Sequence, residues 1–141
     1  MPRRRRLFAV FAPWLLCLAA CVHRGEFTAE DHKAIRAVIV RQLEAFRRDD
    51  AVSAFAYASP EIQAKYGTPG NFMTAIKAFY EPVYRPRRTG GFTNLYVLDG
   101  YLTQPVLLIG PDGDFVVALY TMQRQADGDW KILGCSLIPD R

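Results

Sequence analysis

Side chains that could transfer protons or bind metal ions are few and widely spaced in this chain of 141 residues. Of the two histidines, His23 lies near the N-terminus and His32 in the first turn of an expected helix, so partners for a zinc site or a Ser/His/Asp triad are missing. The aspartates stand mostly where turns or helix caps need them. Cys135 is alone in an apolar strand, where a cysteine is usually a small buried hydrophobe. The sequence therefore predicts no catalytic residue, no metal site and no cofactor.

Three other features indicate a pocket for a ligand. Gln42 interrupts an apolar stripe, so its amide faces inward and needs a partner, either a core hydrogen bond to a strand or a ligand. Arg85, between Tyr84 and Pro86, is the most constrained residue of a basic cluster and could receive a carboxylate or an anionic headgroup. Tyrosine rings with polar ends suit a ligand cavity or the rim of a core. The candidate ligand-binding residues are Gln42, Tyr66, Tyr80, Tyr84, Arg85 and Tyr120, and the expected ligand is small and apolar or weakly anionic.

Helical signals dominate the chain before Pro86. Thr28 and Asp31 have the spacing of a capping box, and apolar residues follow at the spacing of one helical face. Pro82 is expected to stop the last helix of this region. The expected helix starts are Thr28, Asp50, Ser59-Pro60 and Thr68-Pro69.

After Gly90 the apolar residues alternate with a period of two, which is typical of strands. Asp-Gly dipeptides separate the runs and favour tight hairpin turns. Pro105 argues that its strand is a sheet edge or carries a bulge. These signals predict an antiparallel meander with turns at Asp99-Gly100, Asp112-Gly113 and Asp127-Gly128.

The segment from Phe115 to Met122 is apolar in both of its alternating sets. Both faces of that strand should therefore be covered. The helices can cover one face, and a second copy of the chain could cover the other, so a homodimer is expected.

The N-terminal segment has the pattern of an export signal. Four arginines, Arg3 to Arg6, precede an apolar run from Leu7 to Ala20, which is shorter than the ~20 residues that a membrane-spanning helix needs. The run ends in Leu18-Ala19-Ala20-Cys21. This ending resembles the signal of bacterial lipoproteins, in which the cysteine becomes the lipid-modified N-terminus.

We therefore expect residues 1–20 to be removed, Cys21 to carry acyl chains that hold the protein on a membrane, residues 21–27 to form a tether, and residues 28–141 to form one domain. The tether after Cys21 would reach at most ~20 Å. Val22, by resemblance to lipoproteins of bacteria with two membranes, favours the outer membrane, with the domain facing the periplasm. An ordinary secretory signal stays open as the alternative and would leave the domain periplasmic or secreted.

Charge excludes one class of partner. The chain has 18 Lys and Arg residues and 14 Asp and Glu residues. Four of the arginines belong to the export signal, so the mature domain would carry 14 basic and 14 acidic side chains. A neutral domain offers no footprint for nucleic acid, and we expect none to bind.

Helices followed by a curved sheet of about four antiparallel strands resemble the cone-shaped α+β domain of the nuclear transport factor 2 and SnoaL-like group, with its cystatin-like architecture. A closer resemblance, to the DUF4864 family of bacterial envelope proteins, rests on residues 41–50 (RQLEAFRRDD), 55–60 (FAYASP), 66–69 (YGTP), 80–86 (YEPVYRP) and 129–132 (DWKI). It spans roughly Lys33 to Ile138. The family implies a fold but no catalytic residues.

Two functions remain at this point. The first is a lipid-anchored module that binds a small ligand or another protein. The second is a cofactor-free enzyme, because the wider group that this sequence resembles includes isomerases and cyclases that hold an acid or base inside the cone. An open cone without an ionisable group would favour binding.

Overall fold

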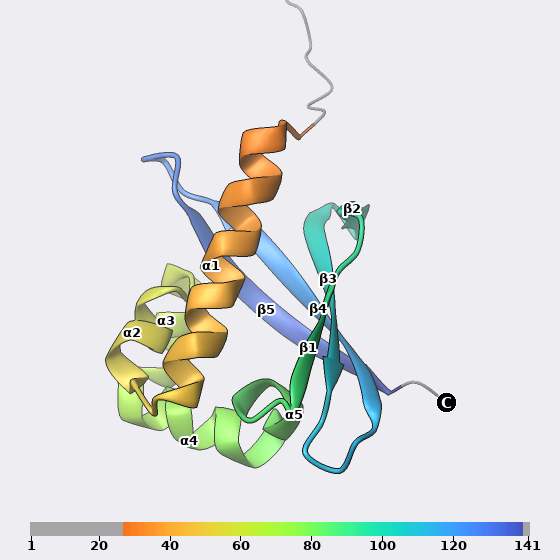
Figure 1. Cartoon of the computed structure of the whole chain (residues 1–141). Coiled ribbons are helices and arrows are strands. Elements are labelled where there is room, and N and C mark those ends of the chain that lie inside the picture. Colours follow the sequence, from red (N-terminus) through yellow and green to blue (C-terminus); the bar gives the residue numbers. More distant parts are fainter. Residues whose placement is uncertain (1–26, 140–141) are drawn as a thin grey trace, which may run out of the picture.

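The computed structural model describes residues 27–139, which form five helices followed by five strands (Figure 1). The helices are α1 (Ala29–Arg47), α2 (Ala51–Ala56), α3 (Pro60–Tyr66), α4 (Pro69–Phe79) and α5 (Glu81–Tyr84). The strands are β1 (Arg88–Phe92), β2 (Tyr96–Leu98), β3 (Tyr101–Ile109), β4 (Phe115–Arg124) and β5 (Trp130–Pro139). Within residues 27–139, no helix is long and apolar enough to cross a membrane.

Side-chain caps begin the first four helices where the sequence predicts them. Thr28 and Asp31 form a complete capping box at the start of α1. Asp50, Ser59 and Thr68 each accept a hydrogen bond from a backbone N–H in the first turn of the helix that follows. The expectation for Pro82 is corrected: α4 ends at Phe79, and Pro82 lies in the first turn of the short helix α5, where its missing N–H costs nothing.

The strands form one antiparallel sheet in the order β1-β3-β4-β5, and the short β2 also pairs with β3. Asp99 and Gly100 have φ values of 50° and 82°, as the tight turn between β2 and β3 requires. The predicted fold class, α+β with helices followed by an open antiparallel sheet, is confirmed. The sheet has five strands because the residues before Asp99 form a separate strand of three residues.

Pro105 lies in the interior strand β3, whose pairing with β4 has no register shift, so both expected alternatives, an edge strand and a bulge at Pro105, are wrong. The reason is local: β1 ends at Phe92 opposite Val106, and β2 begins at Tyr96 opposite Thr103. Pro105 thus faces the gap between two short strands, where its missing N–H leaves no ladder bond unmade. The Gln104 side-chain amide bridges this gap by donating to the carbonyl oxygen of Thr93 at 2.8 Å.

The core lies between α1 and the inner face of the sheet. Ile35, Ile39 and Phe46 on α1 are fully buried, as are Ala118 and Tyr120 on β4. Figure 1 shows α1 crossing the sheet, while the shorter helices gather beside its C-terminal half. Each large apolar side chain buried here stabilises the fold by roughly 1.5–3 kcal/mol.

The outer face of the sheet is partly apolar and carries residues that alternate with the buried set. Val117 and Leu119 are half-buried there, and Phe115 and Ile138 are about half exposed (49% and 48%). Val117 pairs with Ile138 across β4 and β5, which brings these side chains into one group. A homodimer through this face stays a prediction.

If a second copy covers this face, the double variant Phe115→Lys, Ile138→Lys should be monomeric, because four like charges would meet across a two-fold contact. Sedimentation of the lipid-free domain with its natural sequence at micromolar concentration should then show a dimer, and sedimentation of the double variant should show a monomer. Val52→Lys is the matched control, since Val52 is 70% exposed on α2. A monomer for the unmodified domain would contradict the prediction.

Candidate functional site

A cavity of about 260 Å³ lies between the helices and the strands β4 and β5. Its apolar wall is built from buried side chains of several elements, namely Phe46, Phe72, Ile76, Val83 and Ile132. Phe72 holds this wall together, because its ring packs against those of Phe46, Phe55 and Tyr66 at centroid distances of 6.0, 5.4 and 5.5 Å. The volume is close to the lower end of the ~300–1,000 Å³ typical of small-molecule sites.

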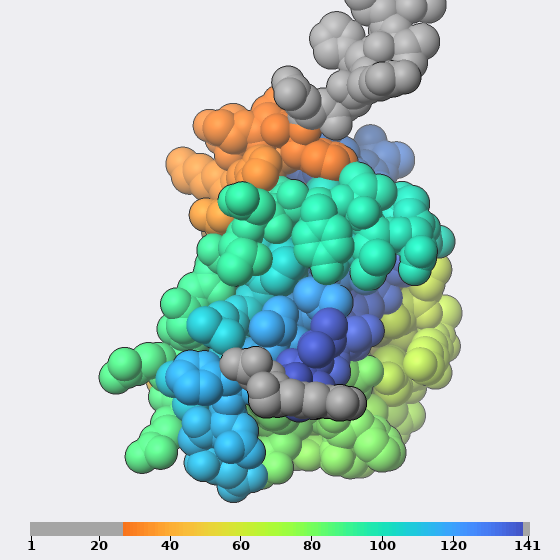
Figure 2. Space-filling view, turned by 90° about the vertical axis from the view of Figure 1, so that its right-hand side faces the viewer, coloured from red at the N-terminus to blue at the C-terminus, as the bar shows by residue number. Residues whose placement is uncertain are grey.

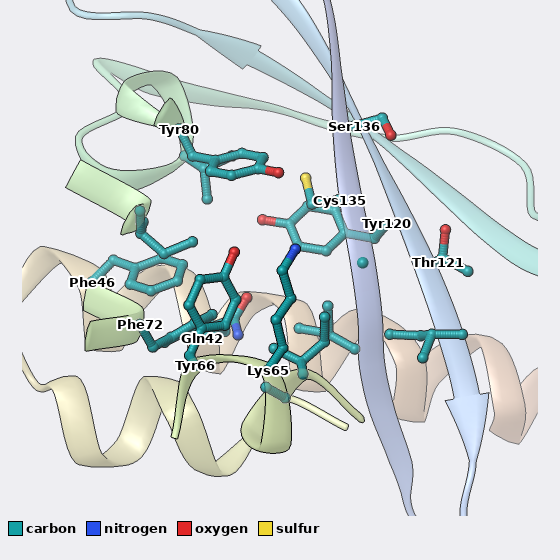
Figure 3. Close-up of a pocket in the computed structure, with 17 residues that line it drawn as sticks. Gln42, Phe46, Lys65, Tyr66, Phe72, Tyr80, Tyr120, Thr121, Cys135 and Ser136 are labelled. Carbon is teal, nitrogen blue, oxygen red and sulfur yellow. The ribbon is translucent and has the colours of Figure 1, made fainter. Parts of the chain in front are cut away.

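Tyrosine hydroxyls converge in this cavity. Figure 3 shows the hydroxyls of Tyr66, Tyr80 and Tyr120 and the thiol of Cys135 directed into the same space. Tyr120 is fully buried, and its hydroxyl has no hydrogen-bond partner among the described residues. A buried hydroxyl without a partner is costly, so this group is a donor that a ligand could satisfy.

Burial keeps these groups protonated. It raises the pKa of Tyr120 well above its ordinary value, and Cys135 adds to the effect. The pKa of Tyr80 is also raised, mainly by burial and to a lesser degree by Cys135 and Tyr66. Phenols with raised pKa values donate hydrogen bonds at neutral pH and are poor bases. The cavity can therefore hold an oxygen acceptor but is not equipped to remove a proton.

Gln42 lines the cavity and also makes a core hydrogen bond. Its side-chain amide nitrogen donates to the carbonyl oxygen of Ala54 at 3.1 Å. The inward orientation expected from the sequence is therefore present, but the partner belongs to α2 and not to a strand. This bond fixes α2 beside α1 and holds the amide at the cavity wall (Figure 3).

Lys65 supplies the one charged group among the described residues that line the cavity. It is exposed, like Ser136, and these two residues mark the mouth. Its ammonium nitrogen lies 5.3 Å from the centroid of the Tyr66 ring. Sequence reasoning missed this residue, because a lysine in the last turn of a helix is explained by the helix dipole alone.

Tyr84 and Arg85 are not among the lining residues. The Arg85 guanidinium donates to the carbonyl oxygen of Phe46 at 2.8 Å and to Asp49 at 2.7 Å, and its carbon lies 4.3 Å from the Tyr84 ring centroid. The Tyr84 hydroxyl donates to Asp49 at 2.5 Å, and this bond is the main reason that the pKa of Asp49 is lowered. Both residues thus bind the C-terminal end of α1, while the other four candidates share the cavity. The ligand-binding role predicted for Tyr84 and Arg85 stays untested, and it would have to be exerted outside this cavity, beside Asp49.

Cys135 should be chemically inert. Burial raises the pKa of its thiol from 9.0 to about 12, so the nucleophilic thiolate is scarce at neutral pH. No group of three or more His, Cys, Asp or Glu side chains within residues 27–139 could hold a metal ion. The arrangement offers hydrogen-bond donors, a cation and an apolar wall.

The raised thiol pKa predicts a loss of stability in alkali. Below pH 9 the thiol is protonated in both the folded and the unfolded protein, whereas between pH 9 and pH 12 mainly the unfolded protein ionises. The free energy of unfolding should therefore fall with rising pH in that range, by up to about 1.4 kcal/mol per pH unit from this group. Urea unfolding at several pH values should show a smaller slope for Cys135→Ala. An equal slope would contradict the assignment.

The fold defines a class: a cystatin-like α+β domain, here with an internal cavity between the helices and the sheet. A solved structure from Nostoc punctiforme PCC 73102, described as a protein of unknown function with a cystatin-like fold, matches with a TM-score of 0.54 at 12% identity and covers 82% of this chain and 96% of its own. At that identity the likeness concerns the fold alone.

The particular family follows from the sequence. Residues 28–141 match DUF4864, a domain of unknown function, and the chain belongs to that family. The resemblance seen in the sequence blocks is thereby confirmed at the level of the family. No curated protein matches the sequence.

Proposed function

We propose that this protein is a lipid-anchored binding module of the bacterial cell envelope, whose cavity holds a small molecule with an apolar body and a weakly acidic head. The observation that carries the proposal is the Tyr120 hydroxyl, which is buried in the cavity wall without a hydrogen-bond partner among the described residues. A carboxylate at this position would accept from the phenols, and Lys65 at the mouth complements its charge.

Binding is favoured over catalysis because the tyrosine and cysteine side chains of the site stay protonated at neutral pH. An isomerase or cyclase needs a group whose pKa lies near the working pH, so that it can both take and give a proton. Burial moves the pKa values of Tyr120 and Cys135 away from that range. A cofactor-free enzyme stays the alternative, and proton exchange at a bound ligand's acidic carbon would support it.

Octanoate and octan-1-ol are suitable probes, because they differ only in the head group. Calorimetry on the domain from residue 22 onward should show tighter binding of octanoate. Tyr120→Phe should weaken octanoate binding by about 1 kcal/mol or more through loss of a charge-assisted hydrogen bond, while leaving the free domain as stable or more stable. Lys65→Gln should weaken it by up to about 1 kcal/mol, because the ammonium is solvent-exposed.

Two residues outside the cavity provide matched controls. Tyr84→Phe removes a hydroxyl that donates to Asp49, and Arg85→Gln removes a cation paired with the same carboxylate. Both should leave octanoate binding unchanged. If Arg85→Gln weakens binding as much as Lys65→Gln does, the anion lies at Arg85 and not in this cavity.

The lipid anchor is proposed from the sequence, since Cys21 lies outside the described residues. Placement in the outer membrane, facing the periplasm, is part of the proposal, and a periplasmic or secreted protein is the alternative. What supports it is the order of basic residues, apolar run and small residues before Cys21.

Cys21→Ser should abolish labelling by palmitate and move the protein from the membrane fraction to the soluble fraction, because the acyl chains are the proposed anchor. Cys135→Ser is the matched control and should keep both the label and the membrane location. Membrane retention of Cys21→Ser without any label would contradict the anchor.

A further inference from the structure

The hairpin of β2 and β3 carries a cluster of exposed large apolar side chains. Tyr96, Val97, Leu98 and Tyr101 are 40%, 59%, 45% and 52% exposed, and they surround the Asp99-Gly100 turn. Because side chains alternate along a strand, Tyr96, Leu98 and Tyr101 lie on one face of the hairpin and Val97 lies on the other, so apolar groups are exposed on both faces of its tip. Isolated apolar residues are common on protein surfaces, but four of them around one turn are typical of an interaction site. We call this group the hairpin patch.

The hairpin patch lies at the margin of the sheet and outside the buried core. β2 has three residues, all exposed, and lies off the main path of the sheet, pairing with the first residues of β3. Asp99 and Gly100 supply the positive φ values that the turn requires. About half of the surface of the side chains in the hairpin patch stays exposed in the folded chain, and that half contributes nothing to its stability.

The hairpin patch lies at the end of the molecule where the N-terminal segment joins the domain. The ring of Phe27 packs on Trp130 with a centroid distance of 6.4 Å. Trp130 pairs with Arg124 at the end of β4, and Leu102, next to the hairpin turn, pairs with Met122 nearby on β4. Figures 1 and 2 agree that the hairpin and the first turns of α1 occupy the same end.

We infer that the hairpin patch inserts into the interfacial layer of the membrane to which Cys21 is attached. This inference rests on the proposed lipid anchor. The six residues between Cys21 and the domain reach at most ~20 Å, so this end of the molecule must stay close to the headgroups. Tethering raises the effective concentration of the patch at the bilayer to about the millimolar range, so weak apolar contacts are sufficient.

The chemistry of the hairpin patch suits the interface of a bilayer. Tyrosines are favoured at the headgroup level, where the ring is buried and the hydroxyl stays hydrated. The charges at this end are mixed: Lys33 lies in one pocket with Glu30 and Asp129, and Arg124 pairs with Asp31 at 3.6 Å. Insertion is therefore apolar in origin and independent of salt, and the carboxylate of Asp99 at the tip keeps it shallow.

The test uses the full-length protein reconstituted into phosphatidylcholine vesicles. Val97→Cys carries an environment-sensitive nitrobenzoxadiazole probe in the patch, and Val52→Cys carries the same probe on α2, where Val52 is 70% exposed. We expect a blue shift of emission and severalfold stronger quenching by headgroup spin-labelled lipid for Val97→Cys. The unmutated protein corrects for labelling of Cys135.

The outcomes separate the two proposals. A protein that does not float with vesicles contradicts both the anchor and the hairpin insertion. A protein that floats but whose two probes respond alike contradicts the insertion alone. A blue shift that fades on dilution of the protein in the vesicles shows that a second copy covers the patch, and this also overturns the inference.

Discussion

Burial of one face of α1 along the sheet is the interaction on which the rest of the structure depends. Ile35, Ile39 and Phe46 leave no exposed surface, and they pack over the inward side chains of β3 and β4. The helix also sets where the chain can go next. Because α1 ends beside Asp49, the shorter helices must fold back next to its C-terminal half and cover the remaining part of the sheet.

The cavity results from the way the shorter helices cover this part of the sheet. The short helices leave room over β4 and β5, between the ring cluster around Phe72 and the side chain of Tyr120. Two polar groups at the cavity wall have opposite effects on the stability of the fold. The amide of Gln42 is satisfied by Ala54 and joins two helices, whereas the hydroxyl of Tyr120 has no partner among the described residues and costs stability.

Local signals were sufficient for the starts of the first four helices and for one hairpin turn, but not for the site. Caps at Thr28 and Thr68 and the Asp99-Gly100 turn act within a few residues, so the sequence predicts them directly, whereas Asp112-Gly113 and Asp127-Gly128 lie in longer loops. Tyr80 and Tyr84 look alike in the sequence, yet the break between α4 and α5 sends one to the cavity and the other to Asp49. That separation depends on tertiary packing. The sequence could not predict the gap facing Pro105 either, because the gap depends on which strands flank β3.

The gap between β1 and β2 opposite Pro105 affects how readily another chain could add a strand to this edge of the sheet. A continuous edge strand offers a row of unpaired backbone groups on which another chain can grow a sheet. Here β1 and β2 are short and offset, and the Gln104 amide occupies the carbonyl of Thr93 between them. An incoming strand would find no straight template along this edge. On a membrane, where the proposed anchor would concentrate the molecules in two dimensions, this broken edge disfavours growth of a sheet from the β1 and β2 side.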